Sequence, residues 1–174
     1  LFYMGETDLK HRILAIADSY EKQMGFNPRM EAARARALAG QGKTAEADAV
    51  FQTTIEKADP GQMGRIADEM RLAYGAGEAI EKLSEWRKGQ EGWLFYYVLG
   101  NLYQHTDTRK AAEMLARSRD LAESDSSRAT ISQRLGVAYH RLGELQKATE
   151  AYLAALDLRD DPIIRNNLAY IYAE

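Results

Sequence analysis

The chain has 174 residues, of which 45% are hydrophobic and only three are proline, and this length and composition are typical of one helical domain. Its net charge of −3 argues against a dedicated nucleic-acid binder, because such proteins need a basic surface to displace counterions from the phosphates. It has no cysteine, which excludes disulfides and thiolate metal sites, and no apolar run approaches the roughly 20 residues that span a bilayer. The composition leaves cytoplasm and periplasm open, and we expect this segment to contact neither membrane nor nucleic acid.

The first part of the chain gives a weak signal. Residues 8–25 have an indistinct helical pattern, and we assign 1–27 to an N-terminal helix. The chain begins at Leu1 without an initiator methionine and stops at Glu174 within an apolar-periodic stretch. We therefore expect it to be a fragment of a longer protein.

From residue 34 onward, two short patterns alternate along the chain. In the first pattern, a large residue is followed directly by a small one, and a second large residue stands three positions after the small one. This pattern returns every 32 to 36 residues, at 34–38, 66–70, 99–103, 135–139 and 168–172. The second places an alanine four positions before a large residue, at 47–51, 79–83, 111–115 and 148–152. Residues three or four apart share one face of a helix, so the small residue admits a neighbouring helix and the large one fills the space beyond it. The patterns predict helices packed in antiparallel pairs.

Turn and cap residues stand between these segments. Residues typical of tight turns occur at 40–42, 75–77, 105–108 and 143–144. An Asn or Asp followed by proline precedes three of the first-pattern segments, at 27–28, 59–60 and 161–162. Asn and Asp cap helix N-termini, and proline tolerates the first helical position because its missing N–H would be unpaired there. We expect a helix to begin at each of these prolines.

This register resembles the tetratricopeptide repeat, a helix–turn–helix unit of about 34 residues. The resemblance implies an all-α protein, a right-handed α-solenoid of antiparallel helix pairs with about nine to ten helices. The repeats would be 28–59, 60–92, 93–128 and 129–161. Residues 162–174 would be the first helix of a truncated fifth repeat, and 1–27 would hold the second helix of a preceding partial one.

Three features conflict with the repeat. Arg34 takes a position that is usually apolar, and Trp86 takes one that is usually small, so we expect irregular packing within 28–92. Residues 93–99 have the propensity of a strand. The register shared with the other segments nevertheless predicts a helix there.

The sequence contains no nucleophile–base set, no glycine-rich phosphate loop and no metal signature, so we expect neither catalysis nor a cofactor. His105 and His140 lie 35 residues apart at the ends of two first helices, which makes a metal pair conceivable. Polar surface near turns is the simpler interpretation, because a metal needs several converging ligands.

In tetratricopeptide arrays the first helices line a concave groove that holds a partner, and the resemblance implies which residues face it. The candidate partner-binding residues are Arg65, Asp68, Arg71, Tyr97, Asn101, Gln104, Arg134, His140, Arg141, Asn166 and Asn167. An exposed Tyr97 beside Asn and Arg would have the composition of a binding hot spot. The alternative is that Tyr97 packs on the preceding helix.

The same assignment makes the groove basic. It would hold six arginines against Asp68 and Glu174, a net charge of +4; these are Arg29, Arg36, Arg65, Arg71, Arg134 and Arg141. The planar fork of arginine binds both oxygens of a carboxylate, so we expect an acidic protein or peptide partner. Ordinary solvated charge is the alternative.

Two functions therefore remain open. The chain is either a protein-interaction scaffold or a regulatory or targeting module of a larger enzyme or envelope-assembly protein, whose chemistry lies outside it. The last helix lacks a partner, so its apolar side chains would favour self-association through the C-terminal end. These side chains are Ile163, Leu168, Ile171 and Tyr172.

Overall fold

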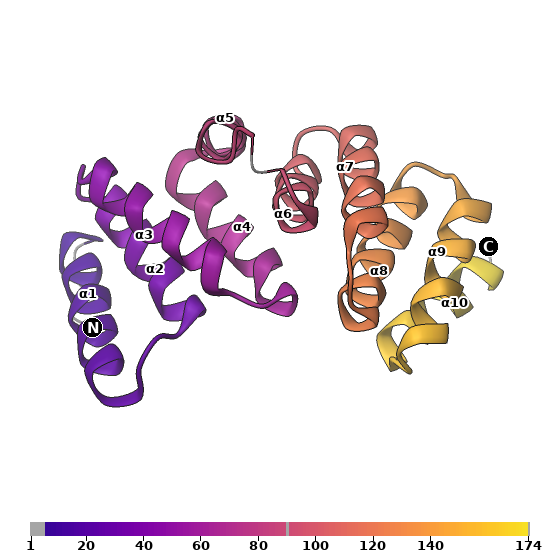
Figure 1. The fold of residues 1–174 in the computed structure, drawn as a ribbon, viewed down its shortest axis with the longest axis horizontal. Coiled ribbons are helices and arrows are strands. Elements are labelled where there is room, and N and C mark those ends of the chain that lie inside the picture. The colour runs from indigo at the N-terminus through magenta and orange to yellow at the C-terminus, as the bar shows by residue number, and fades with distance from the viewer. Residues whose placement is uncertain (1–5, 90, 174) are drawn as a thin grey trace. The chain divides into compact units, whose positions relative to one another are not determined.

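The computed structural model describes residues 6–89 and 91–173, and within them the chain forms ten α-helices and no strand (Figure 1). The helices are α1 (Glu6–Met24), α2 (Pro28–Ala39), α3 (Thr44–Lys57), α4 (Pro60–Tyr74), α5 (Ala76–Trp86), α6 (Trp93–Tyr103), α7 (Thr108–Leu121), α8 (Asp125–Arg141), α9 (Leu145–Leu158) and α10 (Pro162–Ala173). None of the helices described is long and apolar enough to cross a membrane. The helical expectation for residues 93–99 is confirmed, since they open α6.

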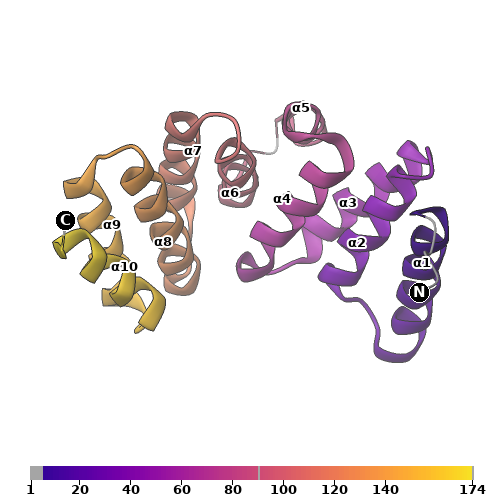
Figure 2. The ribbon, with the colours of Figure 1, turned by 180° about the vertical axis from the view of Figure 1, so that it is seen from behind.

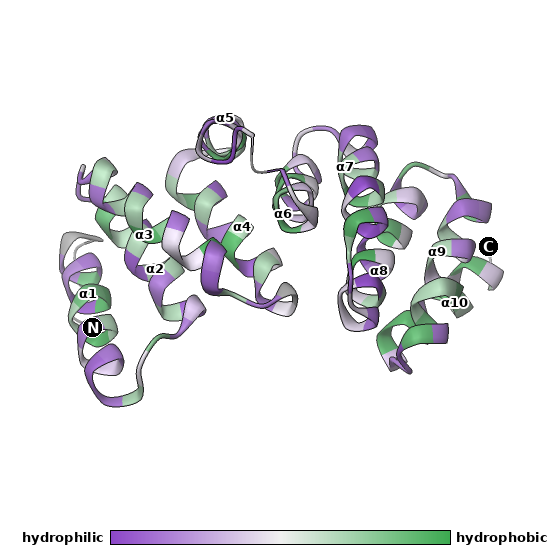
Figure 3. Ribbon diagram, in the orientation of Figure 1, coloured by the Kyte–Doolittle hydropathy of each residue, from purple (hydrophilic) through white to green (hydrophobic). Residues whose placement is uncertain are grey.

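The chain divides into two compact units, Leu1–Lys82 and Leu83–Glu174, with the division inside α5. In the second unit, α6 packs with α7 and α8 with α9, while α10 packs on α9 (Figure 2). In Figure 3, α7 and α8 carry both hydrophobic and hydrophilic stretches, as helices with one buried and one solvated face do.

The spacing of small and large residues has a direct structural cause in this unit. A Cβ placed on Gly100 would lie 2.7 Å from Cγ of Leu115, and one placed on Gly136 would lie 2.6 Å from the ring of Tyr152. Ala148 and Tyr152 are buried, in one cluster with Leu168 of α10. The small residue of one helix therefore touches the large residue of its partner, as the two patterns predict.

Two of the three predicted caps form side-chain hydrogen bonds. The side chain of Asn27 accepts from the backbone N–H groups of Arg29 and Met30, and that of Asp161 accepts from the N–H of Ile163. Asp59 occupies the N-cap position of α4 without such a bond. Ser124 caps α8, which begins at Asp125 rather than at the predicted residue 129.

In the first unit, α2 packs against α1, α3 and α4. Arg34 of α2 occupies a repeat position that is usually apolar, and ion pairs compensate its charge there. Its guanidinium forms ion pairs with Asp18 and Glu21 of α1 and with Glu31 on its own helix. Burial raises the pKa of the Glu31 carboxyl, and the nearby Arg34 opposes the rise. Arg34 therefore fastens α1 to α2 through charges where other repeats use apolar contact.

The link between α4 and α5 is shorter than the sequence predicts. The expected turn at 75–77 is reduced to Gly75, whose φ of 80° favours glycine, because α5 already begins at Ala76. Helices that reverse into a hairpin are usually joined by two to five residues. Accordingly, α5 does not lie along α4 as α3 lies along α2 (Figure 1).

A half-buried polar contact holds α5 through Lys82, just past the middle of that helix. The carboxylate of Asp48 in α3 accepts a hydrogen bond of 2.8 Å from the Tyr74 hydroxyl and pairs at 2.9 Å with the Lys82 ammonium. The Lys82 ammonium also lies 4.9 Å from the centroid of the Tyr74 ring. Burial, followed by the hydrogen bond to Asp48, raises the pKa of Tyr74. Asp48 thus joins α3, α4 and α5.

Candidate functional site

In the second unit, the candidate residues of α8 and α10 lie on exposed or half-buried positions. Arg134 and Arg141 are both exposed and seven residues apart on α8, so they lie on the same side of that helix. The imidazole of His140 packs edge-on against the ring of Tyr170 in α10, with 5.7 Å between centroids. Asn166 is exposed on α10. The structure therefore brings His140 next to α10 and leaves both arginines accessible.

Asn167 has a structural role as well. Its side chain is hydrogen-bonded to the hydroxyl of the buried Tyr152. Burial raises the pKa of Tyr152, while this hydrogen bond and the nearby Arg141 oppose the rise. Asn167 consequently links α10 to α9. Arg141 lies close enough to the Tyr152 hydroxyl to interact with it electrostatically.

The expectation that Tyr97 is an exposed binding residue is wrong. Its side chain is 1% exposed, so the alternative of a packed tyrosine holds. Asn101 is also buried, and its amide donates a 2.8 Å hydrogen bond to the backbone carbonyl of Tyr97 one turn earlier. Gln104 is half-buried, and its amide nitrogen is buried with no hydrogen-bond partner among the described residues. Helix α6 is therefore a core helix at Tyr97 and Asn101, and the half-buried Gln104 is its C-cap residue.

Tyr170 supplies the exposed aromatic surface that was expected of Tyr97. It is 58% exposed, while its ring still contacts His140. The repeat register places Tyr170 two residues after Leu168, in the row that the resemblance assigns to the groove, although Asn101, which holds the same position after Leu99, is buried.

The apolar residues of α10 fall into two groups. Leu168 and Ile171 are buried against α9, whereas Ile163 and Tyr172 are exposed. Part of the apolar face of α10 is thus covered within the chain, and self-association through it stays a prediction.

In the first unit, the candidate residues of α4 are partly paired. Arg65 and Asp68 are exposed, and Arg71 approaches Asp68 with a nitrogen–oxygen distance of 3.6 Å. On α2, Nε of Arg36 lies 3.1 Å from a carboxylate oxygen of Glu69. Glu69 therefore offsets part of the positive charge expected here; Glu174, the other acid of the predicted groove, lies outside the described residues.

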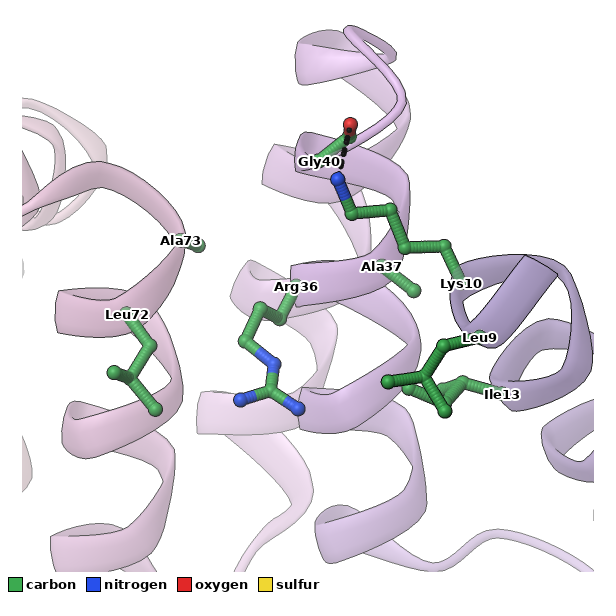
Figure 4. A pocket seen from close by; sticks show the side chains of 8 residues that line it. All are labelled: Leu9, Lys10, Ile13, Arg36, Ala37, Gly40, Leu72 and Ala73. Carbon is green, nitrogen blue, oxygen red and sulfur yellow. Dashed lines mark hydrogen bonds between the residues drawn. The ribbon is translucent and has the colours of Figure 1, made fainter. Parts of the chain in front are cut away.

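A hollow of about 330 Å³ lies within the first unit, between α1, α2 and α4 (Figure 4). Leu9 and Ile13 of α1 form one wall and Leu72 of α4 the other, with Arg36 between them. Sequence reasoning placed Arg36 near a groove but missed the contribution of α1. Among residues 6–89 and 91–173, no group of three or more His, Asp or Glu side chains could hold a metal ion.

Comparison with known proteins finds similarity in structure and none in sequence. No protein-family model matches the chain, and no curated protein matches it by sequence. A crystal structure of MamA is similar over 99% of this chain and 85% of its own, with 18% identity and a TM-score of 0.56. A MamA fragment from Desulfovibrio magneticus RS-1 is similar over 91% of this chain and 99% of its own, with 18% identity and a TM-score of 0.50.

A repeat protein from another organism shares the same architecture. The C-terminal part of a TPR repeat-containing protein from Cytophaga hutchinsonii has 16% identity and a TM-score of 0.52, over 95% of this chain and 66% of its own. At these identities the likeness concerns the fold. Together with the paired helices and the small-to-large contacts at Gly100 and Gly136, it shows that the chain has the tetratricopeptide-repeat fold, an α-solenoid of helical pairs.

Proposed function

We propose that the chain is a protein-interaction scaffold that binds an acidic segment of a partner protein, with the exposed side of α8 and α10 as a principal contact. The tetratricopeptide-type fold supports a scaffold in general, because it presents rows of helices whose outer residues are free to vary without disturbing the helix pairs. The acidic character of the partner rests on the arginines.

The observation that carries the proposal is the contrast between Arg134 and Arg141 and other arginines of the chain. Many arginines already have an acidic side chain within 4 Å; these include Arg34, Arg36, Arg71, Arg109, Arg119, Arg128, Arg159 and Arg165. Arg134 and Arg141 are exposed and have no such partner among the described residues, which also holds for Arg29 and Arg65 of the first unit. Arg134 and Arg141 differ from those two in that they lie together on one side of a single helix, α8. They therefore keep their full capacity to bind carboxylates.

The neighbouring aromatic ring adds an apolar anchor. Tyr170 is exposed and rests on His140, the residue next to Arg141. Tyrosine offers a large apolar face at low conformational cost, and arginine and tyrosine are both enriched in binding hot spots. A partner segment with Asp or Glu would pair with the arginines while an apolar side chain packs on Tyr170.

A peptide array probed with the full chain tests this function. We expect the bound peptides to be enriched in Asp and Glu. Arg134→Glu should weaken their binding about tenfold or more, which corresponds to about 1.4 kcal/mol, because reversal of the charge replaces attraction by repulsion.

Arg109→Glu is the matched control. Arg109 is exposed on α7, a second helix, and lies 3.8 Å from Glu144, a distance typical of a weak surface pair. If the bound peptides are neutral or basic, or if Arg134→Glu and Arg109→Glu weaken peptide binding equally, the partner is not an acidic segment bound at Arg134.

A further inference from the structure

The hollow between α1, α2 and α4 combines apolar walls with a charged centre (Figure 4). Leu9 is 49% exposed on one side of it and Leu72 is 53% exposed on the other. Single exposed leucines are ordinary on protein surfaces, but two that face one another across a hollow resemble the walls of a binding site.

The guanidinium of Arg36 reaches between these walls (Figure 4). Its Nε edge faces Glu69, and no other partner is present among the described residues. The two terminal nitrogens of the guanidinium therefore remain available, and they have the spacing that binds the two oxygens of a carboxylate. The guanidinium of Arg36 can therefore bind a second carboxylate in addition to that of Glu69.

Lys10 places a second positive charge at the rim. Its ammonium donates a 3.0 Å hydrogen bond to the backbone carbonyl of Gly40, at the C-terminal end of α2. The two charged residues that line the hollow, Lys10 and Arg36, are both basic, and Glu69 lies beside Arg36. An acidic ligand would be attracted to the hollow and a basic one repelled.

The hollow is preformed by contacts on both sides. A Cβ on Gly40 would lie 2.7 Å from Cε of Lys10, so glycine allows the lysine stem to cross the end of α2. At the other end of α1, Arg34 holds Asp18 and Glu21. Because α1 is fastened at both ends, a ligand would not have to order it on binding.

We propose that this hollow binds an acidic side chain flanked by large apolar side chains, supplied by an internal segment of a partner protein. The inference rests on the proposed scaffold function and names a second contact and its chemistry. The carboxylate pairs with the terminal nitrogens of Arg36, while the apolar neighbours cover Leu9 and Leu72. A volume of about 330 Å³ lies at the lower end of the range of ligand pockets, which favours a few side chains over a large cofactor.

Fluorescence polarisation with synthetic peptides tests the proposal on the full chain. Each peptide has a Gly/Ser background, acetyl and amide ends, and one central triplet: Leu-Glu-Leu, Leu-Gln-Leu, Ala-Glu-Ala or Leu-Lys-Leu. We expect Leu-Glu-Leu to bind at least about tenfold more tightly than each of the others, since it alone offers both the charge and the apolar cover. Equal binding of the Glu and Gln peptides, or no binding of any peptide, would overturn the proposal.

Variants locate the contact. Arg36→Gln should reduce binding of the Leu-Glu-Leu peptide to that of the Leu-Gln-Leu peptide, and Leu72→Ser should weaken both. Arg36→Gln also leaves Glu69 without its partner, so the double variant Arg36→Gln/Glu69→Gln should show the same loss if the guanidinium itself binds the ligand. Arg109→Gln, on α7, is the control for the loss of one positive charge.

The remaining outcomes separate this inference from the proposed function. If Arg134→Glu abolishes binding of the Leu-Glu-Leu peptide while Arg36→Gln leaves it intact, acidic segments bind to α8 and the hollow plays no part. A requirement for a free C-terminal carboxylate, or Arg36-dependent self-association in sedimentation with no peptide bound, would also overturn the inference, because the occupant would then be a chain end or a second copy.

Discussion

Replacing Gly136 by alanine is expected to lower the free energy of unfolding by about 2 kcal/mol. The added methyl group would lie 2.6 Å from two ring atoms of Tyr152, which is buried and cannot swing away. Overpacking of this kind costs up to about 3 kcal/mol. The better helix propensity of alanine returns about 1 kcal/mol.

The same substitution at Gly77 should have the opposite sign. Gly77 lies in the first turn of α5, and a Cβ placed on it would meet nothing within 4 Å. We expect Gly77→Ala to stabilise the protein by about 0.5–1 kcal/mol, because it only restricts the unfolded chain and favours the helix. Urea unfolding measures both variants, and a stabilised Gly136→Ala would show that α8 and α9 do not approach as described.

Removal of the Asp48 carboxylate is expected to cost about 2–4 kcal/mol. In Asp48→Ala, the half-buried Tyr74 hydroxyl loses its acceptor, and the Lys82 ammonium loses its 2.9 Å partner while it keeps a longer contact of 3.8 Å with Glu78. A half-buried donor that loses its acceptor bears a desolvation cost, and the loss of the nearest opposite charge adds to it. Amide exchange should accelerate in α5, since Asp48 joins that helix to α3 and α4 through Lys82.

Two further variants distinguish the stabilising effect of the Asp48–Tyr74–Lys82 network from that of an ordinary surface ion pair. Tyr74→Phe removes one hydrogen bond and leaves the Asp48–Lys82 pair, so we expect a loss of about 1 kcal/mol. Asp120→Ala removes an exposed carboxylate that pairs with the adjacent Arg119, and it should change stability by less than about 0.5 kcal/mol. A loss in Asp48→Ala no larger than that in Asp120→Ala would contradict the role given to Asp48.

The recurring small and large residues were sufficient to predict the helices and, in the second unit, their pairing, whereas the predicted pairing of α4 with α5 is not seen. A glycine such as Gly136 and a tyrosine such as Tyr152 meet across one helical pair, so the sequence pattern records the contact directly. Helix starts at Pro28 and Pro162 were likewise predictable, because Asn27 and Asp161 cap their helices through local hydrogen bonds.

Features that depend on distant residues were not predictable in the same way. From the sequence, Arg34 is a charged residue at a position that is usually apolar. Only the structure shows that Asp18 and Glu21 of α1 pair with it. The burial of Tyr97 depends on three-dimensional packing, and its position in a groove-facing row gives no sign of it. The hollow at Arg36 depends on where α1 docks, and the weak pattern of residues 8–25 does not determine that position.

The association rate of an acidic peptide from the array, measured at increasing salt concentration, tests the central claim most directly. If exposed Arg134 and Arg141 attract an acidic segment, the rate constant should fall steeply as the Debye length shortens below about 10 Å. Arg134→Glu should lower the rate at low salt and flatten its salt dependence. A rate constant that is independent of salt, or equally salt-dependent in the wild-type chain and in Arg134→Glu, would contradict an acidic partner bound at this surface.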